Sequence, residues 1–187
     1  MRLPFDLIVF DLETAGAPDH RVIEIGAVRL DRDLNVSGRW GSLIDGRPVD
    51  EETQAIHGIS NEMLAGKPKF AEIHTEFDEW CQRSETYVMS AFGAYFDIPV
   101  LREEYKRISR KYPHPGHAVD IKAIVWWDLL KKGMPCKYLN VERTLELLGL
   151  KFEGTRHRGP DDAWNEARIL MAMSKKQEVT KQPKGEA

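Results

Sequence analysis

The chain has 187 residues, 42% of them hydrophobic, and its 27 Lys and Arg side chains face 30 Asp and Glu, for a formal charge of -3. This length suits one globular domain better than two, because typical domains hold roughly 100 to 200 residues. The charge excludes a surface that is basic throughout.

The charge is unevenly distributed along the chain. Residues 1–101 contain 9 basic and 18 acidic side chains, whereas the remaining residues contain 18 basic and 12 acidic ones. Scattered, solvated charge explains such a split in most proteins. The split matters for function only if particular carboxylates share a site.

Neither the cysteines nor the N-terminus indicates a secreted or membrane protein. Cys81 and Cys136 are too few for a disulfide framework, and no Cys or Cys/His spacing indicates a zinc site. The first apolar run, residues 7–10, lies between Asp6 and Asp11 and is too short for a signal peptide or a membrane span. We therefore expect a soluble protein in the reducing cytoplasm.

Three strand patterns open the chain. Residues 7–10 form a continuous apolar run of strand formers, which is typical of a buried central strand. Residues 22–28 follow as a second strand, and a third is expected near residues 40–44, after a polar turn at residues 31–37. Short turns between three successive strands predict an antiparallel meander.

Helical and strand-like patterns alternate in the rest of the chain. Apolar residues recur at helical spacing from Phe70 to Cys81, and a strand-like segment follows at residues 87–89. Further helices are expected at residues 101–108, 121–130, 139–148 and 160–174, with a short extended piece at residues 118–120. Antiparallel strands followed by alternating helices and strands predict an α/β domain with a mixed sheet flanked by helices.

The domain is expected to cover residues 1–174, because no segment within them has the composition of a linker. Residues 175–187 are polar, show no periodicity and contain Pro183 and Gly185. They predict a disordered tail.

Two carboxylates follow the most apolar strand pattern. Asp11 and Glu13 are two residues apart, and side chains at this spacing on a strand share a face. Adjacent like charges repel, and a divalent cation with oxygen ligands would compensate them. The alternative is that the strand simply reaches solvent after Phe10.

Further acids occur at two expected helix starts. Asp97 follows a small-residue turn, where an acid also stabilises the helix dipole without any other role. Pro160 favours a helix start, so His157 lies on the approach loop and Asp162 in the first turn. This brings an imidazole and a carboxylate together. The alternative is that Asp161 and Asp162 are both merely helix-start acids, and this explanation is sound for at least one of them.

Taken in order, these pieces resemble the DEDDh group of 3′-to-5′ exonucleases. The matching segments are residues 10–14 (FDLET), Asp97 within residues 96–101 (FDIPVL), and His157 followed by Asp162. Residues 22–28 (VIEIGAV) resemble the second strand of the group, and residues 56–59 (IHGI) its recurring His-Gly-Ile loop. The resemblance spans about residues 7–173, and three ordered motifs are far more specific than any one of them.

One departure from the group concerns substrate preference. The group often has Asn four residues before the second-motif Asp, preceded by His, whereas this chain has Gly93 and Phe92. The metal ligand Asp97 is retained. This middle segment, with the opening and closing motifs, most resembles the Eri-type branch, which trims RNA 3′ ends.

The resemblance implies a ribonuclease H-like fold and a two-metal site. Asp11, Glu13, Asp97 and Asp162 would hold two Mg²⁺ or Mn²⁺ ions, and His157 would be the general base. Carboxylate oxygens suit hard cations, and an imidazole titrates near neutral pH.

Substrate contacts are expected from a different set of residues. By resemblance, Thr14, Ala15 and His57 face the terminal nucleotide, although His57 equally well ends a helix beside Gly58. Trp126 and Trp127 could stack on bases, but packing is the preferred interpretation, because a helix over residues 121–130 must turn at least one of them to the core. Phosphate contacts or a solvated basic face explain Lys131, Lys132 and Lys137 equally well, together with the basic residues 102, 106, 107, 110 and 111.

The implied function is hydrolysis of phosphodiester bonds from the 3′ end of single-stranded RNA or short oligonucleotides, with release of nucleoside 5′-monophosphates. A DNA-directed proofreading or repair exonuclease is the alternative among enzymes, and a non-catalytic nucleic-acid-binding domain the alternative outside them. The expected partner is a single-stranded nucleic acid, RNA rather than DNA, and no membrane. The sequence does not indicate an oligomeric state. The charge split then describes an acidic pocket beside a basic approach.

Overall fold

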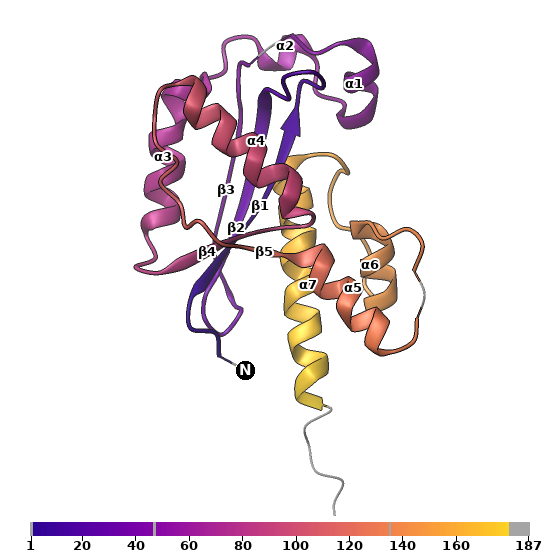
Figure 1. Ribbon diagram of the computed structural model, residues 1–187. Helices are drawn as coiled ribbons and strands as arrows, with labels where there is room; N and C mark the ends of the chain where they lie inside the picture. The colour runs from indigo at the N-terminus through magenta and orange to yellow at the C-terminus, as the bar shows by residue number, and fades with distance from the viewer. Residues whose placement is uncertain (1, 47, 135, 180–187) are drawn as a thin grey trace, which may run out of the picture.

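In the computed structural model, which describes residues 2–46, 48–134 and 136–179, five strands form one sheet (Figure 1). The strands are β1 (Asp6–Thr14), β2 (Val22–Leu30), β3 (Val36–Leu43), β4 (Tyr87–Ala91) and β5 (Ala118–Asp120). The helices are α1 (Glu51–His57), α2 (Asn61–Leu64), α3 (Phe70–Gln82), α4 (Ala94–Arg107), α5 (Ile121–Lys131), α6 (Val141–Leu148) and α7 (Gly159–Val179).

The sheet is mixed, as the sequence predicts. Its strand order is β3-β2-β1-β4-β5, with β1, β2 and β3 antiparallel to one another and β4 and β5 parallel to β1. The apolar strand β1 lies at the centre. Parallel strands end at the same edge of a sheet, so the C-terminal ends of β1, β4 and β5 lie together.

Two helical layers cover the sheet because successive side chains of β1 point to opposite faces. Ile8, Phe10 and Leu12 pack in one core with residues of α3 and α4, whereas Leu7 and Val9 pack in a second core with residues of α5, α6 and α7. Figure 1 shows these helices on the two sides of the sheet. A third, smaller core lies under α1 and α2.

Strand β1 does not end with its continuous apolar run at Phe10. It continues to Thr14, because Asp11 pairs with Gly26 and Glu13 with Glu24 in the antiparallel register with β2. The buried side chain of Leu12 also packs in the first core. Both carboxylates therefore stand on a rigid strand.

The structure also differs from the predicted elements at β3, α1, α2 and α7, and α4 begins at Ala94 rather than near residue 101. Strand β3 begins at Val36, and the short helices α1 and α2 were not predicted because their N-caps Asp50 and Ser60, rather than an apolar period, define them. Helix α7 continues to Val179, so residues 175–179 of the predicted tail are helical. Residues 180–187 lie outside the described residues, and for them the tail stays a prediction.

The interpretation of Trp126 and Trp127 as packing residues is wrong. Helix α5 buries only one stripe, Ile121, Val125 and Leu129, which recurs every four residues. The side chains between these positions turn outward, so Trp126 is 39% and Trp127 63% exposed. Both tryptophans lie on the surface.

Both cysteines are free thiols. Burial raises the pKa of the Cys81 thiol, so this side chain is not ionised at neutral pH. In the part of the chain that the structure describes, no helix has the length and apolarity needed to cross a membrane.

Candidate active site

Three of the predicted metal ligands come together at the end of the central strand. Asp11 and Glu13 project from the same face of β1, and Asp162 from the first turn of α7. Each offers a carboxylate oxygen, and these atoms all lie within 4.8 Å of one another. The spacing of two on a strand and the helix start at residues 159–160 both produce the arrangement that the sequence predicts.

A glycine pair allows α7 to reach this position. A Cβ atom added at Gly26 of β2 would lie 1.9 Å from the carbonyl carbon of Gly159, and one added at Gly159 would lie 2.9 Å from the Gly26 nitrogen. The start of α7 therefore rests directly on the backbone of β2, opposite Asp11. Any larger residue at Gly26 would push Asp162 away from β1.

Glu24 fastens the loop before α7 to the sheet. Its side chain is only 2% exposed. It accepts hydrogen bonds from Arg158 Nη2 at 2.6 Å, from Arg158 Nε at 3.0 and 3.2 Å, and from the Gly159 amide at 2.8 Å. Glu24 also faces Glu13 directly across β1 and β2, so Arg158 supplies a positive charge beside two neighbouring carboxylates.

Glu24 and Arg158 were not identified from the sequence, although each left a signal. Glu24 is a charged residue in a strand whose nine residues are all buried, and a buried charge needs a partner. Arg158 is one of the two arginines that flank His157.

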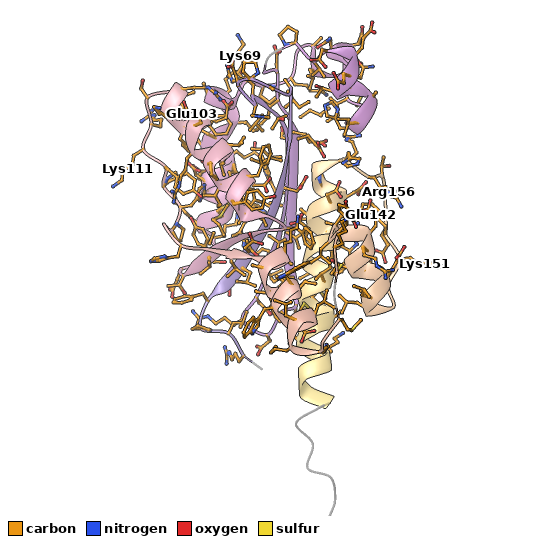
Figure 2. The ribbon with its side chains drawn as sticks, turned by 45° about the vertical axis from the view of Figure 1, so that its right-hand side comes forward. Lys69, Glu103, Lys111, Glu142, Lys151 and Arg156 are labelled. Carbon is orange, nitrogen blue, oxygen red and sulfur yellow. The ribbon has the colours of Figure 1, made fainter. Side chains whose placement is uncertain are left out.

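Two further contacts hold the same loop. Asp161 accepts a hydrogen bond from the Thr155 amide at 2.8 Å, and Arg156 pairs with Glu142 of α6 at 3.2 Å (Figure 2). Asp161 is thus a structural acid, as one of the two neighbouring aspartates was expected to be. The loop that carries His157 is fixed along its length.

His157 is exposed and adopts a left-handed backbone conformation, with φ of 54°. This conformation is uncommon for residues other than glycine and is maintained by the surrounding contacts. Burial raises the pKa of Asp162 to about 6, and the hydrogen bond from the Arg158 amide and the proximity of His157 oppose this rise. His157 therefore lies beside Asp162, as predicted.

Asp97 joins the acidic centre from α4. It lies in the first turn of the helix, after Gly93 with φ of 101°, and is 6% exposed. Burial raises its pKa to about 7, against hydrogen bonds from the backbone amides of Asp97 and Leu12. Asp97 is not one of the three carboxylates within 4.8 Å, but its charge raises the pKa of both Asp11 and Glu13.

The acidic centre resists ionisation as it stands. Burial, followed by the charges of neighbouring carboxylates, raises the pKa of Asp11 well above its ordinary value and that of Glu13 to about 8. Carboxylates held so close together need a compensating positive charge. An all-oxygen donor set of this kind suits a hard divalent cation.

A fifth carboxylate, Glu166, was missed from the sequence. It lies one turn after Asp162 on α7, is 2% exposed, and accepts a hydrogen bond from the Phe92 amide at 3.0 Å. Burial and the charge of Asp97 raise its pKa well above the ordinary value. Its spacing of four from Asp162, which places both carboxylates on the same side of the helix, was the available signal.

The predicted substrate contacts differ in their exposure. Thr14 is half-buried at the end of β1. His57 is 4% exposed, and its Nδ1 accepts a hydrogen bond from the Ile59 amide at 3.0 Å. Ala15 is 0% exposed, which argues against a direct contact with substrate. All three assignments remain predictions.

Comparisons with known proteins agree with this geometry. The Exonuclease family model, RNase_T, matches residues 8–170. DNA polymerase III subunit epsilon of Treponema pallidum is 31% identical over 157 residues, which cover 82% of this chain and 69% of that protein. The chain spans less than half the length of the Escherichia coli subunit, to which it is 35% identical over 114 residues covering 57% of this chain and 46% of that protein.

One solved structure has the same fold over most of its length. The nuclease domain of 3′hExo, described as a DEDDh family member bound to rAMP, matches with a TM-score of 0.75 over 92% of both chains at 19% identity. The family model spans most of the chain, and the ordered acidic residues meet in one site. The chain therefore belongs to the Exonuclease (RNase T) family, in its DEDDh group of 3′-to-5′ exonucleases.

Proposed function

We propose that this protein removes nucleotides from the 3′ end of single-stranded RNA or short oligonucleotides and releases nucleoside 5′-monophosphates. The observation that carries the proposal is the meeting of Asp11, Glu13 and Asp162 within 4.8 Å, beside Asp97 and His157. This set combines oxygen ligands for cations with a side chain that can move a proton.

In this mechanism Asp11, Glu13, Asp97 and Asp162 would hold two Mg²⁺ or Mn²⁺ ions. When bound, the ions stabilise the negative charge that develops in an in-line phosphoryl displacement. His157 accepts a proton from the attacking water on an imidazole nitrogen as the water oxygen bonds to phosphorus. The bond to the leaving 3′ oxygen breaks, and that oxygen takes a proton from solvent.

The fixed loop gives this step its precision. Arg158 holds the backbone next to His157 through Glu24, and its amide donates to Asp162 Oδ2 at 3.0 Å. The base and a metal ligand are thus positioned by the same residue. Positioning before the reaction lowers the entropic cost of bringing water and phosphate together.

RNA is the preferred substrate in this proposal. Its support is the Eri-like closing motif, residues 157–163, and the fold shared with a nuclease domain bound to rAMP. A DNA-directed proofreading exonuclease is the second candidate, supported by the similarity to DNA polymerase III subunit epsilon. Both would use the same acidic site.

We place this activity in the cytoplasm. The two cysteines are free thiols, which suits a reducing compartment. The chemistry needs only a single-stranded nucleic acid and divalent cations as partners.

The test uses a single-stranded RNA labelled at its 5′ end, and a DNA of the same sequence, each incubated with Mg²⁺ or Mn²⁺. The wild type is expected to give a ladder of shorter labelled products, whereas Asp11→Asn and His157→Ala are expected to lose activity by about 10³-fold or more. Glu103→Gln, which removes an exposed partner of Lys106, is the matched control and is expected to keep full activity. A wild type that shortens neither strand with any divalent ion would overturn the proposal, and the ratio of kcat/KM values decides between RNA and DNA.

A further inference from the structure

Exposed apolar side chains are concentrated on one part of the surface. Of the large hydrophobic side chains that are exposed in the described residues, half lie between residues 124 and 138: Ile124, Trp126, Trp127, Leu130, Met134 and Tyr138. Trp127 is 63% and Tyr138 77% exposed. We call the exposed side of residues 122–134 and 136–138, on α5 and the loop after it, the α5 surface.

Helix α5 is apolar on more than its packed face. Its buried stripe is Ile121, Val125 and Leu129, yet Trp127 and Leu130 lie three residues apart on the outward side. A helix that is hydrophobic all round is normally buried all round. Contiguous exposed apolar side chains mark an interaction site.

The same segment is basic. Residues 122–138 contain four lysines and one acid, Asp128, in a chain whose formal charge is -3. Lys132 pairs with Asp128 at 2.5 Å, and Lys137 lies over the Tyr138 ring at 5.4 Å from its centroid. Lys122 precedes Trp126 by four residues, and Lys131 follows Trp127 by four, so each tryptophan has a lysine on its own side of the helix.

Interleaved aromatic rings and lysines suit a single-stranded nucleic acid. Bases stack on exposed rings with little regard to sequence, while lysines contact the phosphates. A purely apolar protein partner would not use the positive charge. The positive charge of this surface therefore favours a single-stranded nucleic acid over a protein as its binding partner.

The α5 surface begins at the acidic centre. Asp120 caps α5 by accepting from the Ala123 amide at 3.0 Å, and its charge acts on Asp97 and Glu166. Figure 1 shows α5 running from the end of β5 away from the sheet. Eleven residues of helix extend about 16 Å, which matches roughly five nucleotides at the rise of a stacked strand.

We infer that the α5 surface binds the part of a single strand that lies upstream of its 3′-terminal nucleotide. This inference rests on the proposed function, since it names how the substrate of that site is held. Trp127 and Tyr138 stack bases, and Lys131 and Lys137 contact phosphates. Substrates of several nucleotides reach this surface, whereas a dinucleotide does not.

The first test compares a dinucleotide with a twelve-nucleotide strand as substrates. Trp127→Ala and Tyr138→Ala are expected to lower the ratio of kcat/KM for the long strand to kcat/KM for the dinucleotide by about 10-fold each, since one stacked base contributes about 1–3 kcal/mol. Phe5→Ala, which removes another exposed aromatic ring, is the matched control and leaves the ratio unchanged. An unchanged ratio in both α5 variants contradicts the inference and is the result expected if the surface binds a protein.

The second test measures binding without turnover, so that its outcome does not depend on the proposed activity. Asp11→Asn protein is titrated with a fluorescein-labelled twelve-nucleotide strand, and its tryptophan fluorescence is expected to be quenched less when Trp127 is replaced by Phe. Lys131→Gln is expected to weaken binding and to reduce the salt dependence by about 0.7 in log Kd per log salt. Equal quenching with and without Trp127, or a salt dependence unaffected by Lys131, would overturn the inference even for an active exonuclease.

Discussion

The Arg158 guanidinium and the Glu24 carboxylate meet at 2.6 Å and join the loop that carries His157 to strand β2, beside the acidic residues of β1. Glu24 also accepts from the Gly159 amide and lies opposite Glu13 in the sheet. The buried Glu24 carboxylate thus fixes the end of the loop and the start of α7. It also holds the positive charge of Arg158 next to Glu13.

Removal of Glu24 is therefore predicted to affect both stability and catalysis. Glu24→Ala is expected to lower the free energy of unfolding by roughly 2–4 kcal/mol, because it leaves Arg158 and the Gly159 amide without their acceptor. Glu24→Gln keeps an acceptor for the Gly159 amide and is expected to recover part of this loss. Urea denaturation measures the stabilities, and kcat is expected to fall in both variants with a smaller effect on KM.

Glu103 provides the matched control for this prediction. It pairs with Lys106 at 3.3 Å on the exposed side of α4, where an ion pair contributes at most about 1 kcal/mol. A Glu24→Ala variant no less stable than Glu103→Ala would contradict the role assigned to Glu24.

The close approach of Gly26 and Gly159 predicts the effect of a single methyl group. Gly26→Ala places a Cβ atom 1.9 Å from the Gly159 carbonyl carbon, so the start of α7 must move away from β2. Asp162 moves with it, and we expect a loss of Mn²⁺ binding by isothermal titration calorimetry together with reduced stability. Gly116→Ala, where no atom lies within 4 Å of the added Cβ, is expected to behave as the wild type. A normal Mn²⁺ affinity in Gly26→Ala would show that the contact between Gly26 and Gly159 does not determine the position of Asp162.

The raised pKa values predict an unusual pH dependence of the metal-free protein. In the folded state the pKa is about 8 for Glu13, 7 for Asp97 and 6 for Asp162, against ordinary values of 4.5, 3.8 and 3.8. At pH values between the ordinary and the raised pKa of each group, the folded state therefore binds more protons than the unfolded state. The stability of the folded state falls as the pH rises through this range. In EDTA, Tm is expected to decrease from about pH 5 to about pH 8.5, and excess Mn²⁺ is expected to reverse the trend by replacing the protons.

The control for this prediction changes one carboxylate at a time. Asp11→Asn is expected to flatten the decrease of Tm with pH in EDTA, since it removes one of the mutually repelling charges. Asp33→Asn changes an exposed turn residue that pairs with Arg2 at 3.9 Å, and it is expected to leave the decrease of Tm with pH unchanged. A wild type whose Tm rises with pH in EDTA would mean that the acidic centre does not dominate the titration.

The sequence predicts this site well where short-range rules apply. The spacing of Asp11 and Glu13 on a strand and the position of Asp162 after Pro160 follow from backbone periodicity alone. Partners distant in sequence are not predicted in this way, because Glu24 meets Arg158 only through the antiparallel register and the docking of α7. Glu166 was missed although it lies four residues after Asp162, because its other neighbours, the Phe92 amide and Asp97, are distant in sequence.

The exposed tryptophans show a second limit of the sequence pattern. An apolar helix over residues 121–130 indicates burial, but only contact with the sheet and α7 determines how many of its faces are covered. One stripe is covered, and Trp127 is left outside. Departures from the apolar pattern of this kind point to a surface with a binding role.

The neighbouring aspartates Asp161 and Asp162 offer the most direct test of the central claim, that a carboxylate cluster at the end of β1 performs divalent-dependent 3′-to-5′ hydrolysis. The two residues share a helix turn, yet Asp162 belongs to the cluster and Asp161 binds the Thr155 amide. The measurement is the rate of shortening of a 5′-labelled single-stranded RNA in Mn²⁺ by each Asn variant. The account predicts a loss of about 10³-fold or more for Asp162→Asn and less than about 10-fold for Asp161→Asn, whereas equal rates in the two variants would contradict it.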